Sequence, residues 1–209
     1  MSLQAWYHQR VFPHLLDRVM QVPGLTTLRQ QLLAPLSGEV VEIGFGTGLN
    51  LAHYPPEVTG VVAIDPGTGV HRLAEPRMAA ARIPVRFELL SAERLPLATG
   101  SVQTLVSSWT LCSIPDVQGA LAEIRRVLDP VQGRFHFVEH GLAPEPRLAR
   151  WQHRLTPVQR VVADGCHLDR DMPALLRGAG LVLEVCEQFW VPGLPRLGAY
   201  MTLGRARVG

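Results

Sequence analysis

Apolar and polar positions along the chain follow two different spacings. Short, mainly apolar runs, typical of buried strands, occupy residues 40–43, 60–64, 85–90, 102–107 and 135–138. Between these runs the apolar positions recur every three or four residues, as in 115–128, where Leu121, Ile124 and Leu128 share one helical face. Strands that alternate with helices predict a parallel sheet covered on both faces. We therefore expect an α/β fold with a doubly wound, mostly parallel sheet.

The N-terminal segment, residues 1–37, carries a helical pattern without strands. Tyr7, Val11, Leu15 and Val19 fall on one face, and Pro13 is placed to begin a second helix, where its missing N–H costs little. We expect two short helices here. The segment mixes aromatic, aliphatic and basic residues, so it either packs over the sheet edge and closes the site, the interpretation we favour, or lies on a membrane surface.

Length and composition indicate one globular domain, residues 1–209, because 47% of the residues are hydrophobic and 18% are charged. The formal net charge of +2 and the scattered arginines do not predict a nucleic-acid partner. Three cysteines without paired spacing predict no disulfide framework and fit a reducing, cytoplasmic compartment. No feature of the sequence indicates an oligomeric state.

The hydropathy of the chain predicts no integral membrane span. No apolar stretch approaches the roughly 20 residues that a spanning helix needs, and the N-terminus lacks the apolar core of a secretory signal. Peripheral membrane contact through the N-terminal segment stays open.

The stretch "VVEIGFGTGLN", residues 40–50, places three glycines directly after a buried run. Gly44, Gly46 and Gly48 allow a sharp turn in which a ligand approaches the backbone N–H groups. Their spacing differs from the G-x-G-x-x-G of dinucleotide-binding enzymes. Glu42 would repel a pyrophosphate but attract a cation, which favours S-adenosylmethionine, whose sulfonium and ammonium groups are positive.

A second run, "VVAIDPG", ends in Asp65 about 20 residues later. An acid at the end of the next strand is placed to accept hydrogen bonds from ribose hydroxyl groups. The glycine turn alone is weak, but the two features together strongly favour a nucleoside cofactor.

These features resemble the class I S-adenosylmethionine-dependent methyltransferases, whose fold is Rossmann-like with seven strands. The resemblance extends to "SAERLPLATGSVQTLVSSWTLCSIPD", which looks like their third and fourth conserved segments. It implies that the glycine loop holds the methionine part of the cofactor, that Asp65 holds the ribose, and that Glu93 replaces Ser91 as the partner of the adenine amino group. The full set of cofactor-binding residues expected from the pattern is Glu42, Gly44, Phe45, Gly46, Thr47, Gly48, Asn50, Asp65, Pro66, Ala92, Glu93, Ser107 and Ser108.

A narrower resemblance covers almost the entire chain after residue 38. The strings "LCSIPD", "EIRRVLDP", "FVEHGLAPEP", "WQHRLTPVQ" and "DGCHLDRD" look like small methyltransferases that include animal thiol methyltransferases. The animal proteins begin with a hydrophobic anchor that does not occur here, so membrane attachment does not carry over. Thiol methylation is what this resemblance implies.

The acceptor side of the site is expected near His140, which ends the strand "RFHFVEH" at the ligand-binding edge. Histidine titrates in the range suited to a base for a thiol or phenol acceptor, although His140 could instead only shape the pocket. Residues 141–170 break the strand and helix alternation, and we interpret them as a substrate-covering insertion. Candidate acceptor-binding residues, each with ordinary packing or capping as the alternative, are Trp109, Trp151, Gln152, Asp164 and Cys166.

No metal is expected, because Cys112, Cys166, His140 and His167 lack the short paired spacing of zinc ligands. The sequence thus predicts an enzyme that uses S-adenosylmethionine to methylate a small, apolar acceptor such as a thiol. Alternatives are N- or O-methylation of a phospholipid headgroup or quinone-type precursor, a catalytically silent cofactor-binding module, and a nicotinamide oxidoreductase.

Overall fold

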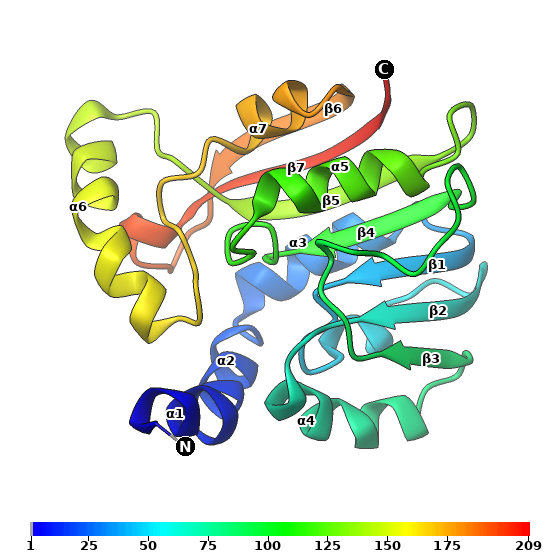
Figure 1. Cartoon of the computed structure of the whole chain (residues 1–209). Coiled ribbons are helices and arrows are strands. Elements are labelled where there is room, and N and C mark those ends of the chain that lie inside the picture. The colour runs from blue at the N-terminus through cyan, green and yellow to red at the C-terminus, as the bar shows by residue number, and fades with distance from the viewer. Residues whose placement is uncertain (1) are drawn as a thin grey trace.

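Seven strands form one sheet in the order β3-β2-β1-β4-β5-β7-β6 in the computed structural model, which describes residues 2–209 (Figure 1). Strand β7 is antiparallel to both of its neighbours, β5 and β6, and the other neighbouring strands are parallel to each other. The doubly wound, mostly parallel sheet expected from the sequence is therefore confirmed. The strands are β1 (Gly38–Ile43), β2 (Val58–Ile64), β3 (Val85–Glu88), β4 (Thr104–Ser108), β5 (Arg134–His140), β6 (Leu181–Trp190) and β7 (Tyr200–Val208).

Helices cover both faces of this sheet (Figure 1). Because the central parallel strands are buried on both sides, their side chains alternate between two apolar clusters. One cluster joins Ile43 and Leu105 to α5 and α7, and the other joins Val40 and Val106 to α3 and α4. The helices are α1 (Leu3–Arg10), α2 (Phe12–Val19), α3 (Pro23–Leu33), α4 (Thr68–Ala79), α5 (Val117–Val127), α6 (Pro146–Val162) and α7 (Met172–Gly178), with short 3₁₀ turns η1 (Leu49–Ala52) and η2 (Arg196–Gly198).

The strand order reverses between β1 and β4, which are neighbours in the sheet although β2 and β3 lie between them in the chain. Ligands of doubly wound sheets bind beyond the carboxyl ends of the strands at such a point. The loop that follows β1 lies there.

The N-terminal segment departs from the sequence prediction. It forms three helices, not two, because Pro23 begins α3 in the same way that Pro13 begins α2. The predicted apolar face is also wrong: Val11, Leu15 and Val19 remain 38–48% exposed, while Pro13 is the buried residue of α2.

Within the insertion predicted at residues 141–170, α6 is a 17-residue helix that stands apart from the sheet (Figure 1). Periodicity did not indicate it, because only Gln152 and Thr156 of this helix are buried. Among residues 2–209, no helix combines the length and the apolar character needed to cross a bilayer.

Candidate active site

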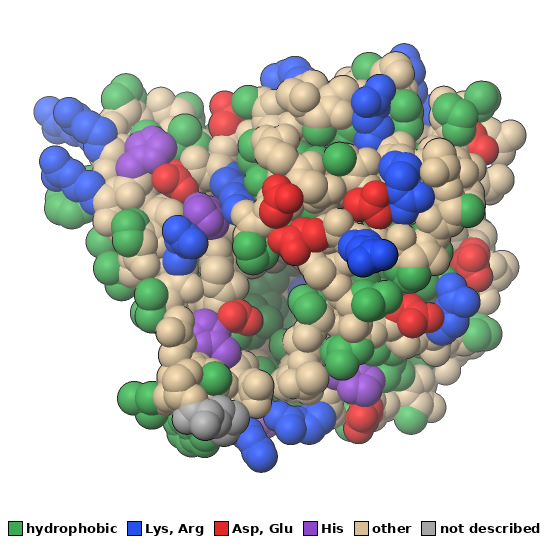
Figure 2. Space-filling view, viewed as in Figure 1, with side chains coloured by type: hydrophobic (Ala, Val, Ile, Leu, Met, Phe, Trp, Pro, Cys, Tyr) green, Lys and Arg blue, Asp and Glu red, His purple; other side chains and the backbone are tan. Residues whose placement is uncertain are grey.

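The loop after β1 lies on the side of the molecule where the arrowheads of β1, β2 and β4 end (Figure 1). Figure 2 shows the surface hollowed on this side, between the carboxyl edge of the sheet and the chain that follows α6. A separate depression lined by Thr99, Gly100 and Pro130 lies at the opposite, amino edge of the strands.

Two glycines of the loop need their lack of a side chain for different reasons. Gly44 has φ +68°, and a Cβ there would lie 1.9 Å from Oγ1 of Thr110, so this glycine lets the loop after β4 pack against the loop after β1. Gly46 has φ +59°, but a Cβ there would come no closer than 3.9 Å to another atom, the carbonyl oxygen of Gly44. The backbone at Gly46 therefore borders open space, which suits the approach of a ligand.

Glu42 lies under this loop with only 1% of its surface exposed. Asn50 donates to one carboxylate oxygen at 2.7 Å, and the Tyr54 hydroxyl donates to the other at 2.6 Å. Asn50 also donates to the Ser108 hydroxyl at 3.2 Å and accepts from Nε of buried Arg29 at 2.7 Å. The network joins α3, β1, η1 and β4 around one carboxylate.

Burial raises the pKa of Glu42 to about 7, against the opposing effects of the hydrogen bonds from Tyr54 and Asn50 and the charge of Arg29. The negative charge of Asp65 adds to the upward shift. Burial and the like charge of Asp65 both disfavour the ionised form of Glu42. A cation that enters beside the two carboxylates offsets both effects.

Asp65 directly follows β2 and lies on the other side of the glycine loop. Its carboxylate accepts from the N–H of Gly46 at 2.8 Å and from the N–H of Gly67 at 2.7 Å. Burial raises the pKa of Asp65, and the charge of Asp164 across the hollow raises it further, against the two backbone hydrogen bonds. The residues around the loop thus carry an excess of negative charge.

The N-terminal segment closes over the glycine loop, as one of the two sequence interpretations proposed. The Thr47 hydroxyl donates to Asp17 of α2 at 2.5 Å, and Arg77 of α4 donates to Asp17 at 2.7 Å and to the carbonyl oxygen of Thr47 at 2.8 Å. These bonds tie α2 and α4 to the loop. Arg77 and Asp17 therefore position the backbone of residues 46–48.

Helix α1 reaches the other wall of the hollow. The Tyr7 hydroxyl donates to the carbonyl oxygen of Val162 at 3.0 Å, and Nδ1 of His8 lies 2.5 Å from Oδ1 of Asp164. Asp164 has a left-handed backbone, with φ +45°, and precedes Gly165 in the turn after α6. The predicted acceptor residue Asp164 thus contacts the N-terminal segment.

Glu139 of β5 holds the loop after β4 by accepting hydrogen bonds from its backbone. This fully buried carboxylate accepts from the backbone N–H groups of Thr110, Leu111 and Cys112 at 2.9–3.3 Å and from the Ser107 hydroxyl at 3.0 Å. The prediction that Ser107 faces the cofactor is not supported, since its hydroxyl points to β5. Ser108 contacts Asn50 instead and stays on the cofactor side.

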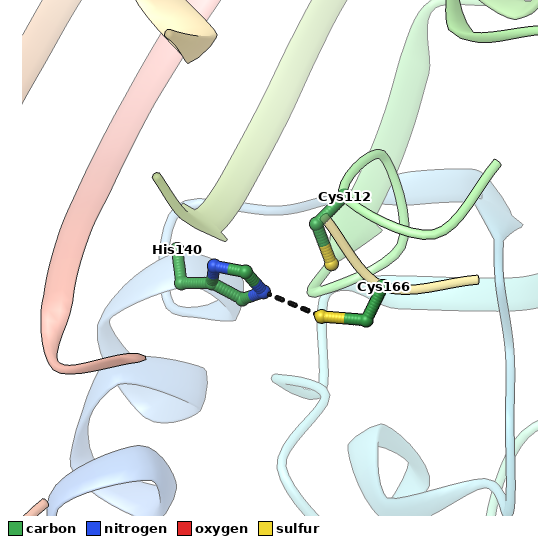
Figure 3. A group of neighbouring side chains, drawn as sticks. All are labelled: Cys112, His140 and Cys166. Carbon is green, nitrogen blue, oxygen red and sulfur yellow. Dashed lines mark hydrogen bonds between the residues drawn. The ribbon is translucent and has the colours of Figure 1, made fainter. Parts of the chain in front are cut away.

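His140 ends β5 at the same edge of the sheet. Its Nε2 lies 3.0 Å from Sγ of Cys166, and its Nδ1 has no hydrogen-bond partner among residues 2–209 (Figure 3). One ligand atom each from His140, Cys166 and Cys112 lie within 4.8 Å of one another, and all three residues are buried. Folding brings the three together from separate elements, which their spacing along the chain does not indicate, and the expectation of no metal stays a prediction.

Burial acts to lower the pKa of His140, but Cys166 and the charge of Glu139 outweigh it and leave that pKa raised. The hydrogen bond with Cys112, together with burial, raises the pKa of the Cys166 thiol far above its ordinary value. Cys166 therefore favours its neutral thiol form, and Cys166, ahead of the charge of Glu139, is the main partner that raises the pKa of His140.

Three other predicted acceptor residues have placements that differ from the prediction. The Trp151 side chain is 54% exposed, with Arg154 over its ring, and Gln152 is fully buried and bonded to backbone atoms of Gly141, Ala143 and Leu197. Trp109 donates from Nε1 to the sulfur of Met201 and lies under the Arg29 guanidinium. Gln152 has no amide hydrogen left for an acceptor, and Trp109 is part of the core beside the site.

Two predicted cofactor contacts also turn inward. The ring of Phe45 is 3% exposed and packs edge-on against Phe87, so only its backbone faces the loop. The Glu93 carboxylate accepts from the N–H of Asp116 at 2.8 Å and from the Ser91 hydroxyl at 3.1 Å. Glu93 thus braces the start of α5, beside buried Ala92, while Pro66 is exposed.

Comparison with known proteins identifies the family. A family model described as a methyltransferase domain matches residues 41–137. Thiol S-methyltransferase TMT1A of Homo sapiens is 32% identical over 185 residues, which cover 82% of this chain and 75% of the relative. The chain belongs to the class I S-adenosylmethionine-dependent methyltransferases. This methyltransferase therefore uses S-adenosylmethionine, as its sequence pattern predicts.

Demethylmenaquinone methyltransferase of Thermobifida fusca is also similar, with 30% identity over 84% of this methyltransferase and 80% of the relative. Among solved structures, an S-adenosylmethionine-dependent methyltransferase of Thermotoga maritima aligns with a TM-score of 0.69 and 21% identity, over 98% of this chain and 99% of that one. The structural likeness supports the fold of this methyltransferase and carries no information on its acceptor.

Gly44→Ala tests the packing between the two loops. We expect it to lower the free energy of unfolding by at least twice as much as Gly193→Ala, measured by urea denaturation. Gly193 has φ +81° with nothing near its Cβ position, so its substitution reports backbone strain alone, about 1 kcal/mol. Gly44→Ala adds displacement of Thr110. Equal losses for the two variants would contradict a tight contact between the loops.

Cofactor affinity should depend on pH through Glu42, whose pKa is about 7 in the free chain. A bound cation favours the carboxylate and lowers that pKa, so the affinity gain is present above pH 7 and is lost as pH falls. Between pH 5.5 and 7 the Kd for S-adenosylmethionine should decrease about tenfold. Calorimetry at pH 6 in two buffers of different ionisation enthalpy should record a released proton. A Kd that is constant over this range, with no proton released, would contradict the assignment.

Proposed function

We propose that this methyltransferase transfers the methyl group of S-adenosylmethionine to the sulfur of a small thiol. The observation that carries the proposal is the buried pair of His140 and Cys166 at the carboxyl end of β5, with Cys112 beside them, next to the strand that contacts the cofactor loop. The human relative named a thiol S-methyltransferase supports the same acceptor.

We assign the cofactor to the open side of the glycine loop. The backbone at Gly46 and the buried Glu42 suit the positively charged methionine part, and Asp65 keeps free lone pairs for ribose hydroxyl groups. The hydroxyl of Ser108 and the amide of Asn50 complete this wall.

The bound cofactor supplies a methyl group on a sulfonium, which is already a good leaving group. The residues of this chain therefore need to hold the acceptor in line, exclude water and assist loss of the thiol proton. The network of Glu42 and the bonds from Asp17 and Arg77 fix the loop, and the buried loop after β4 limits water. His140 is the side chain that we place against the acceptor.

A quinone-type precursor is the second candidate acceptor, because the Thermobifida fusca relative is named a demethylmenaquinone methyltransferase and spans most of this chain. A thiol is favoured because a carbon acceptor gives no reason to gather two buried cysteines around His140.

A panel of thiols, amines, phenols and a quinol precursor separates these candidates by release of S-adenosylhomocysteine. We expect thiols to give the highest kcat/KM, and His140→Asn to lower turnover at least ~100-fold for a thiol of high pKa but less for one already ionised at the assay pH. The affinity for S-adenosylmethionine should stay within about twofold of wild type. Turnover of the quinol precursor alone would replace the thiol, and cofactor binding without turnover of any acceptor would indicate a silent binding module.

A further inference from the structure

Three side chains that bind soft metals meet behind the acceptor position. Cys112 comes from the loop after β4, His140 is the last residue of β5, and Cys166 follows α6 (Figure 3). They are 2–8% exposed, and their ligand atoms lie within 4.8 Å of one another. In Figure 3 both sulfurs and the ring nitrogen Nε2 point toward a common centre.

The backbone around this cluster is fixed from several directions. The Arg170 guanidinium donates hydrogen bonds to the carbonyl oxygens of Leu111 and Ile114. These bonds hold the loop that carries Cys112. The N–H of His167 donates to the carbonyl oxygen of Cys112 at 2.8 Å. These bonds, together with those from Glu139, place the ligand atoms before any ion binds, which is the arrangement that metal sites require.

Gly165 is what allows the two loops to meet. Its φ is +85°, and a Cβ there would lie 2.7 Å from the carbonyl oxygen of Ser113. A residue with a side chain at this position would push Cys166 away from Cys112. The turn is therefore built for close approach of the two sulfurs.

The cluster has little internal hydrogen bonding. Its shortest contact joins His140 Nε2 to Cys166 at 3.0 Å, the Cys112 thiol lies 3.5 Å from the carbonyl oxygen of Trp109, and no group among residues 2–209 fixes the proton at Nδ1. A neutral ring with its proton on Nδ1 directs the lone pair of Nε2 at the two sulfurs, which is the form that ligates metals. Thiols also make weak hydrogen bonds, so hydrogen bonding alone is a poor account of the arrangement.

We propose that Cys112, His140 and Cys166 bind one zinc ion, whose fourth position takes the sulfur of the acceptor. Two thiolates and one imidazole are ligands that zinc prefers, and three protein ligands with one open position are typical of catalytic zinc. The acceptor part of this inference rests on the proposed thiol methylation, but it makes His140 a zinc ligand and lets the bound zinc, in place of a free imidazole, promote loss of the thiol proton.

The electrostatic setting suits an anionic acceptor. Zinc with two thiolates is neutral, so a third thiolate gives the centre one negative charge. Arg170 lies beside Cys112 and Cys166 and carries the compensating charge. The hydrogen bonds of Arg170 to carbonyl oxygens keep this guanidinium in place.

Methyl transfer at the proposed centre needs no oxidant or reductant. The acceptor thiol loses its proton to water when its sulfur binds zinc, because a coordinated thiol is deprotonated. A lone pair of that sulfur forms the new bond to the methyl carbon, the bond from carbon to the sulfonium breaks, and its electron pair stays on the sulfur of S-adenosylhomocysteine. The product thioether is neutral, binds zinc weakly and leaves. Zinc keeps its oxidation state throughout.

The proposed zinc site lies near the cofactor loop, because the loop after β4 contacts both. Thr110 contacts the carbonyl oxygen of Gly44 at 3.4 Å, and Cys112 follows two residues later in the same loop. The loop after β4 therefore has the cofactor loop on one side and the proposed metal ligand on the other.

Metal binding is tested on the full chain after reduction and removal of metal with a chelator. Zinc should bind at one equivalent per chain, and cobalt at the same site should give thiolate-to-metal absorption. Cys112→Ser and Cys166→Ser should each weaken zinc binding at least ~100-fold. Loss of a residue that only orients a metal ligand usually weakens metal binding by about 10- to 100-fold, so a larger loss indicates direct ligands. Cys186→Ser, in half-buried β6, is the matched control and should bind zinc as wild type does.

A measurement on the wild-type chain avoids variants that fail to fold. Bound zinc should protect Cys112 and Cys166 from an alkylating reagent while Cys186 stays reactive, as mapped by mass spectrometry. Equal alkylation with and without zinc overturns the proposal. So does zinc binding that survives both serine variants, or a Cys112–Cys166 disulfide in the reduced preparation.

The test of the acceptor step separates this inference from the proposed function. Addition of a thiol to the cobalt-loaded chain should shift its absorption bands, and the Cys186→Ser chain should respond in the same way. A thiol that is methylated equally well by metal-free and zinc-loaded chains keeps the proposed function and overturns the role of zinc. Zinc binding without methylation of any thiol, together with unshifted cobalt bands, overturns thiol coordination and the proposed acceptor.

Discussion

A buried carboxylate beneath a turn without side chains governs the chemistry of this methyltransferase. Glu42 is held by Asn50 and Tyr54 in a place where water does not reach it. Burial makes its ionised form costly, and the nearby charge of Asp65 adds to that cost. Arg29 offsets part of it through Asn50, yet the pKa of Glu42 remains near 7. A ligand that brings positive charge to the glycine loop supplies what the protein alone lacks.

The acceptor side depends on a different carboxylate. Glu139 uses its oxygens to hold backbone N–H groups of the loop after β4, so that loop has a fixed shape although it follows the end of a strand. Thr110 of this loop packs against Gly44, and Cys112 lies beside His140 and Cys166. In the proposed placement of donor and acceptor, one rigid segment lies between them and aligns them, which is what a reaction with a good leaving group needs.

The fold and the glycine turn after β1 were predictable because their signals are local. The run of Val40 to Ile43 and the three glycines lie within a few residues of one another, and Asp65 follows the next strand. Arg29 was missed because its partner, Asn50, lies 21 residues away and only folding joins them.

The acceptor side was less predictable for the same reason. Cys166 and His140 are 26 residues apart, so a rule based on short ligand spacing does not bring them together and predicts no metal. Trp151 is a pocket candidate in the sequence because residues 141–170 break the strand and helix alternation, and the structure leaves this residue 54% exposed. Asp17 and Arg77 carried no motif at all, although both hold the cofactor loop.

The central claim remains electrostatic, and Glu42→Gln tests it most directly, because glutamine keeps the shape and an accepting oxygen but no charge. The affinity for S-adenosylmethionine at pH 8 should fall at least about tenfold in this variant, and the difference from wild type should disappear near pH 5.5. An unchanged affinity at pH 8 would contradict the account.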